Sequence, residues 1–197
     1  MTDTFPNKYP KSNQEHLASF STIALLYPAG VTVHYTATRG IVGTIKELAT
    51  RNLGYHIIIG RDGTVYQCAE FNFRLNHAGK ASWKGLSPNR EHLAVSLESW
   101  GWVTQKPGGV FETWTGANIP VGEVAERCGK HWDAATSQQE LSLLSFLRWA
   151  VSQGIDPTNI CGHDECAIPF GRKSDPGGVL SLPMPNLREI LSDLYAS

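Results

Sequence analysis

Two histidines and several carboxylates stand where this sequence could build a metal site. His34 ends a β-branched run, and His163 follows a second short apolar run far downstream. The carboxylates near the second histidine are Asp164, Glu165 and Asp175. Zinc sites of hydrolases use three protein ligands, typically histidine nitrogens and carboxylate oxygens, and keep a fourth position for water. Both histidines and one of these carboxylates would make such a site.

The segment around Asp175 makes it the favoured carboxylate. Glycines and Pro176 surround it, which indicates a fixed loop, and Lys173 lies two residues before it. Residues two apart in an extended segment project from the same face, so an ammonium and a metal-bound carboxylate would point into one site. A positive charge there suits a carbonyl oxygen that becomes negative during hydrolysis.

The sequence around these residues predicts both strands and helices, which would position the side chains. Strands are expected at 31–36, 55–60, 64–68 and 93–99, with a tight Asp-Gly turn between the second and third, and again near 160. Helices are expected at 14–26, around 45–49, at 137–154 with a capping box at Ser137–Glu140, and near the C-terminus. Segment 101–133 is rich in Gly, Pro and Trp without periodicity, which favours a long functional loop or insertion.

Composition limits the classes of protein that the chain can belong to. At 197 residues it fits a single domain, and a net charge of −1 argues against a nucleic-acid partner. A signal-peptide pattern and a run of ~20 apolar residues are both missing, so we expect a cytoplasmic protein as synthesised, without a membrane span. We expect most or all of the cysteines to be thiols; a Cys161–Cys166 bridge is an alternative, as is a small zinc site formed by this pair and His163.

Five short motifs occur in the order seen in a known family. They are Val33–Thr38, Gly54–Gly63, His77–Gly79, Gly162–His163 and Arg172–Gly177. Together they resemble the type-2 N-acetylmuramoyl-L-alanine amidases, a zinc-dependent family that includes phage lysozyme-type amidases, amidases of peptidoglycan recycling and peptidoglycan recognition proteins. The resemblance runs from about 31 to 180. It implies a mixed α/β domain over 1–197, with a central mixed sheet, flanking helices and a zinc site at the sheet edge.

The resemblance also implies roles for individual residues. One Zn²⁺ would be held by His34, His163 and Asp175, and water would attack the amide between N-acetylmuramic acid and L-alanine. Lys173 would stabilise the developing oxyanion, and Tyr55 matches a tyrosine that lies beside the zinc-bound water in phage enzymes.

Substrate contacts are expected from a second set of residues. His77 lies in a motif that lines the substrate groove in the family, and Trp83 near it could stack on a sugar. Small residues from Thr36 onward would leave room for substrate.

The subgroup is predicted from Tyr55 and Ser96, although the resemblance makes Asp175 a third ligand of the kind that recycling amidases carry. Recycling amidases carry a glutamate where this chain has Ser96, so the tyrosine-type site favours a monomeric phage endolysin that reaches the host cell wall through a holin. A cytoplasmic amidase that acts on anhydro-muropeptides is the first alternative. A non-catalytic peptidoglycan-binding module is the second, although the complete ligand set argues against it.

Overall fold

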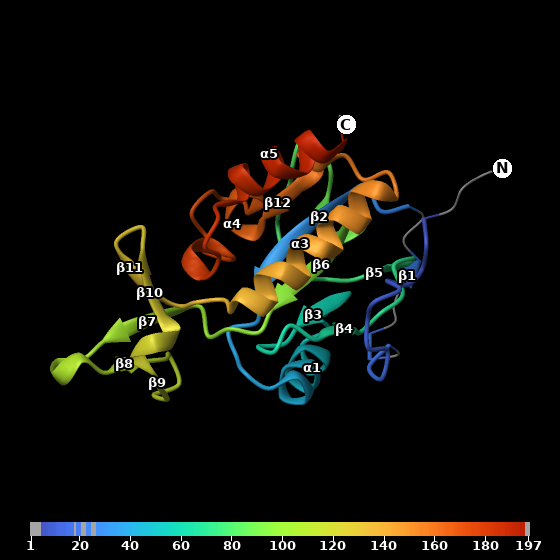
Figure 1. Cartoon of the computed structure of the whole chain (residues 1–197). Coiled ribbons are helices and arrows are strands. Elements are labelled where there is room, and N and C mark those ends of the chain that lie inside the picture. The colour runs from blue at the N-terminus through green and yellow to red at the C-terminus, as the bar shows by residue number, and fades with distance from the viewer. Residues whose placement is uncertain (1–4, 18, 21–22, 25–26, 196–197) are drawn as a thin grey trace.

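A five-stranded sheet forms the centre of the computed structural model, which describes residues 5–17, 19–20, 23–24 and 27–195 (Figure 1). The strand order is β12-β2-β6-β3-β4; the first four strands are parallel, and β4 pairs antiparallel with β3 through the expected hairpin. The strands are β2 (Gly30–Tyr35), β3 (Ile57–Ile59), β4 (Val65–Gln67), β6 (His92–Leu97) and β12 (Ile160–Gly162). A mixed α/β domain is thereby confirmed.

Alternating residues of these strands supply two separate cores. In β2, Val31 and Val33 join the larger core, which helices α3 and α5 cover. On β3 and β6, Ile58 and Ala94 face the opposite way and pack with the side chains of helix α1. Because side chains alternate along a strand, His34 lies on the α1 side of the sheet. The helices are α1 (Ile41–Thr50), α2 (Pro88–Glu91), α3 (Ser137–Ser152), α4 (His163–Cys166) and α5 (Met184–Tyr195).

Two local predictions about helices are wrong. The capping box of α3 lies one residue earlier than expected: extended Thr136 accepts a hydrogen bond from the backbone N–H of Gln139, whose side chain accepts one from the N–H of Thr136. Glu140 instead accepts hydrogen bonds from Ser181. The helix expected at 14–26 is not formed by the described residues of that segment, which make turns and strand β1 (Ile23–Ala24), paired with β5 (Phe73–Arg74); residues 18, 21–22 and 25–26 lie outside the described part.

Segment 101–133, expected to be a long loop or insertion, folds into a second antiparallel sheet. Its order is β10-β11-β7-β8-β9, and it extends from the carboxyl edge of the central sheet as an arm (Figure 1). Val103, Phe111 and Ile119 form its own small core. Strands as short as two residues give no alternation that a sequence pattern can show. The strands are β7 (Trp102–Gln105), β8 (Phe111–Glu112), β9 (Asn118–Ile119), β10 (Val124–Arg127) and β11 (Lys130–Asp133).

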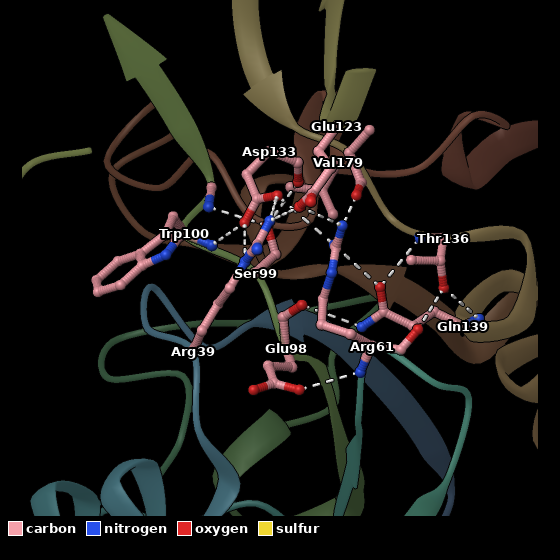
Figure 2. A network of polar contacts seen from close by, with 12 residues as sticks. Arg39, Arg61, Glu98, Ser99, Trp100, Glu123, Asp133, Thr136, Gln139 and Val179 are labelled. Atoms are coloured by element: carbon pink, nitrogen blue, oxygen red, sulfur yellow. Dashed lines mark hydrogen bonds and ion pairs between the residues drawn. The ribbon is translucent and has the colours of Figure 1, made fainter. Parts of the chain in front are cut away.

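A buried carboxylate joins this arm to the central domain (Figure 2). Asp133 is fully buried and accepts hydrogen bonds from the guanidinium of Arg39, between β2 and α1, and from the backbone N–H of Trp100. Arg61, in the β3–β4 turn, lies 3.6 Å from the same carboxylate and donates to the carbonyl oxygen of Ala134. Both ends of the arm are therefore fixed beside the loop that follows His34.

Short 3-10 helices at Pro107–Gly109, Val121–Glu123, Pro157–Asn159 and Gly177–Val179 complete the described secondary structure. All four cysteines are free thiols, with Cys161 and Cys166 both buried. Within the described ranges, the helices are too short or too polar to span a bilayer.

Candidate functional site

Three buried side chains from separate segments meet at the carboxyl edge of the central sheet. His34 lies near the end of β2, His163 begins α4 directly after β12, and Asp175 belongs to the loop that follows. The Oδ2 atom of Asp175 is 2.8 Å from Nδ1 of His34 and 2.9 Å from Nδ1 of His163. One ligand atom from each residue lies within 4.8 Å of the other two, close enough for a single metal ion to contact all three.

A third histidine fixes the tautomer of His34. Nε2 of His77 is 3.1 Å from the carbonyl oxygen of Pro88, so this nitrogen carries the hydrogen and donates it. Nδ1 of the neutral ring is then an acceptor, and Nε2 of His34, 3.0 Å away, must be the donor. The Nδ1 atom of His34 consequently directs a lone pair, not a hydrogen, toward Asp175.

The backbone orients His163 in the same way. Its Nε2 donates to the carbonyl oxygen of Ala78 at 2.9 Å, so Nδ1, which faces Asp175, is the ring nitrogen whose lone pair can bind a metal ion. Three lone pairs thus converge on one point, where they repel each other unless a cation lies between them. Ligand histidines whose other nitrogen donates to protein are typical of metal centres, so the donor set fits a divalent cation.

Asn89 clamps the segment that supports both histidines. Its Oδ1 accepts hydrogen bonds from the backbone N–H groups of His77 and Ala78, both at 2.9 Å, and its Nδ2 donates to the carbonyl oxygen of Gly79 at 2.8 Å. Arg172 adds a hydrogen bond to the carbonyl oxygen of Ala78 at 3.0 Å. Segment 77–79 is therefore a rigid support behind the site.

Burial sets the protonation states of these groups. It lowers the pKa of His34 to about 4, against the opposing effect of Asp175, and it lowers the pKa of His77 well below its usual value. For Asp175, burial opposes ionisation, but the two imidazoles beside it hold the carboxyl pKa well below its usual range. At neutral pH the site offers an ionised carboxylate beside neutral His34.

Tyr55 lies next to the cluster, with its ring centroid 5.1 Å from that of His34. Burial, and then the charge of Asp175, raise the pKa of its phenol above the usual value of 10, so the hydroxyl stays protonated and acts as a donor. Ser96 pairs with His34 across the β2–β6 register, and its buried hydroxyl lies beside the phenol of Tyr55. Lys173 is exposed, and its positive charge adds to burial in lowering the pKa of His34.

The three expected substrate contacts have other partners in the structure. His77 is buried behind His34 with both ring nitrogens engaged. Trp83 donates its indole N–H to the carbonyl oxygen of Thr158, before β12 and so at the opposite end of that strand from His163. The hydroxyl of Thr36 donates to the carbonyl oxygen of Thr38. A substrate contact by any of these three side chains stays a prediction.

The structure brings two further residues to this region, of which sequence patterns did not indicate Asn89 and named Trp114 only as one of several tryptophans that could stack on a sugar. Asn89 follows a proline, a context typical of a turn, and its role depends on partners eleven and twelve residues away. Trp114 was one of several tryptophans without distinguishing neighbours, and only the fold of the arm places it near the site.

Comparison with known proteins bears on what this site does. A family model described as N-acetylmuramoyl-L-alanine amidase matches residues 25–178. No curated protein matches the sequence.

Several solved structures share the fold. A selenomethionine derivative of AmpD superposes with a TM-score of 0.58 at 18% identity, covering 95% of this chain and 98% of that one. AmiD from E. coli, in complex with an anhydro-N-acetylmuramic acid tripeptide, gives 0.59 at 17% identity over 91% of this chain, which spans 60% of that longer protein. The endolysin amidase LysCS from Clostridium intestinale gives 0.57 at 17% identity, covering 94% and 98% of the two chains.

Proposed function

This chain belongs to the family of N-acetylmuramoyl-L-alanine amidases, and on that premise we propose that it uses one Zn²⁺, held by His34, His163 and Asp175, to hydrolyse the amide between N-acetylmuramic acid and the L-alanine of the stem peptide. The convergence of three lone pairs at one buried point supports this proposal most strongly. Two imidazole nitrogens and one carboxylate oxygen are a ligand set that catalytic zinc uses.

Zinc bound here would polarise the scissile carbonyl and bring the pKa of a water molecule toward neutrality. The protonated phenol of Tyr55 donates a hydrogen bond to the reacting oxygen, a role that its raised pKa favours over that of general base. Lys173, exposed at the rim, adds a positive charge opposite the developing oxyanion. All of these side chains come from one chain, so a monomer carries a complete site.

Chelation tests the proposal. Removing metal with EDTA should abolish release of free stem peptide from peptidoglycan, and added Zn²⁺ should restore it. His34→Ala should lose both bound zinc and activity, whereas His16→Ala, which removes a histidine packed against Tyr66 far from the cluster, should keep both. Peptide release that continues unchanged after chelation would contradict the zinc proposal.

We propose that the biological role is that of a phage-type endolysin, which acts on the host cell wall after holin-type release. Support comes from Ser96: the β6 position beside His34 carries a hydroxyl, where the recycling amidases carry a glutamate. Cleavage rates on intact sacculi and on soluble anhydro-muropeptide, measured by mass spectrometry of the products, distinguish the two roles. Preference for the soluble substrate would instead assign the chain to recycling, and binding without cleavage would make it a recognition module.

A further inference from the structure

Trp114 has an exposed indole that a hydrogen bond fixes beside the loop between β2 and α1, which follows His34. It lies between β8 and β9 of the arm and is 65% exposed. Its Nε1 donates to the carbonyl oxygen of Ala37 at 2.9 Å, and its ring packs edge-on against Trp100, with centroids 6.4 Å apart. The indole N–H is already used, so the ring offers a solvent-exposed apolar face with a fixed orientation.

This indole is near His34. Ala37 follows His34 by three residues, which places their Cα atoms at most ~11 Å apart, a distance that a short oligosaccharide spans. Trp114 contacts the loop between β2 and α1, and α1 covers the same side of the sheet that His34 faces. The Arg39–Asp133 contact at the base of the arm keeps this arrangement rigid.

We propose that Trp114 is a saccharide-binding platform that stacks on a sugar ring of the glycan strand, next to the muramoyl residue that is cleaved from its peptide. A flat indole face packs well on the C–H groups of a pyranose ring, and a fixed side chain loses little conformational entropy on binding. Burial is the usual use of tryptophan, and the exposure of this ring is evidence against that use. The position of the muramoyl residue rests on the proposed function.

The arm provides a matched control in Trp102. This indole is 49% exposed and lies opposite Trp132 in the β7–β11 register, so both occupy one face of the arm. The Trp132 ring packs against Tyr35, Gly177 and Gly178 and not against the loop after His34 that Trp114 contacts. Neighbouring Val103 points to the other face, into the small core that Trp100 contacts. Trp102 is therefore an exposed indole on the face of the arm opposite to the small core that Trp100 contacts.

Calorimetric titration with peptide-free glycan fragments, oligosaccharides of alternating N-acetylglucosamine and N-acetylmuramic acid, tests the proposal on the zinc-loaded protein. Trp114→Ala should weaken their binding by about tenfold, as expected for loss of an aromatic anchor. Trp114→Phe should retain most of it, and Trp102→Ala should leave it unchanged. In cleavage assays, Trp114→Ala should raise KM on sacculi but not on a muramoyl peptide with a single sugar.

Wild-type protein that does not bind the peptide-free glycan overturns the proposal, as does equal weakening by Trp114→Ala and Trp102→Ala. The binding assay involves no amide bond, so its outcome is separate from that of the amidase proposal. Loss of glycan binding in Trp114→Ala together with an inactive wild type would reject only the amidase. Active enzyme whose Trp114→Ala variant binds glycan normally would reject only the platform.

Discussion

Replacing Asn89 with alanine is predicted to weaken zinc binding although Asn89 contacts no proposed ligand. The substitution removes three hydrogen bonds that fix segment 77–79. That segment orients His34 through the ring of His77 and His163 through the carbonyl oxygen of Ala78. One side chain thus supports both imidazole ligands.

The size of the effect follows from those contacts. Three hydrogen bonds at about 1 kcal/mol each give an upper limit of roughly 3 kcal/mol, part of which is recovered when water replaces the lost partner. Loss of a residue that orients metal ligands typically costs about 10–100-fold in metal affinity. We therefore expect the zinc Kd to rise by about 10–100-fold and the melting temperature of the metal-free protein to fall by several degrees.

Competition with a chromophoric chelator measures the zinc Kd directly. The control is Asn76→Ala, because this exposed asparagine precedes the same segment and donates only to the carbonyl oxygen of Asn52. A Kd for Asn89→Ala within twofold of wild type, or an equal change in Asn76→Ala, would show that the 77–79 segment does not position the ligands.

Four further outcomes are expected. Tyr55→Phe and Lys173→Met should each lower kcat about 10²-fold or more. Bound zinc, measured by atomic absorption, should be retained in both variants. An unchanged kcat would show that the substituted residue does not take part in catalysis. Burial lowers the pKa of His56 to about 4, as it does for His34 and His92, so the unfolded state binds more protons between pH 6.5 and 4. The share of His56 in the resulting loss of unfolding free energy should be about 3 kcal/mol, measured by urea titrations as the difference in pH dependence between wild type and His56→Phe; equal pH dependence in the two proteins would contradict this assignment. Asp133→Ala should destabilise the protein by about 1–3 kcal/mol, because it leaves the N–H of Trp100 without its buried acceptor and Arg39 with only Glu123 as a carboxylate partner. Glu112→Ala, at an ion pair on the surface of the arm, should change stability by less than about 1 kcal/mol; similar losses in the two variants would mean that the buried contact does not anchor the arm.

Local patterns were sufficient to predict the central domain. The β-branched run before His34, the Asp-Gly turn and the apolar spacing of α3 each reflect interactions within a few residues, so strand, hairpin and helix could be predicted from them. The helix prediction for 14–26 was wrong because the helical spacing competes with the pairing of β1 with β5, a strand far along the chain. The strands of the arm could not be predicted, because their stability depends on Asp133 and on a small core that several short strands share.

Some residues of the candidate site could likewise be predicted from the sequence, and others could not. The cluster of His34, His163 and Asp175 could be predicted because metal ligands must be particular residue types, and here two histidines follow apolar runs and the carboxylate lies in a Pro-Gly loop. The expected substrate role of His77 arose from its motif, and the structure gives this side chain a supporting position that no local signal distinguishes. Asn89 was not predicted because its contacts are with backbone groups, to which many side chains can bind.

The two ends of the arm are adjacent in space, since the backbone N–H of Asp133 donates to the carbonyl oxygen of Gly101 at 2.8 Å and the hydroxyl of Ser99 donates to the carbonyl oxygen of Asp133 at 2.7 Å. A short turn could join the two positions at small entropic cost, leaving the central sheet and the three candidate ligands in place. The arm is therefore an exchangeable module: its length and aromatic surface can change during evolution or by engineering, and the substrate preference of the enzyme can change without altering the residues proposed for catalysis.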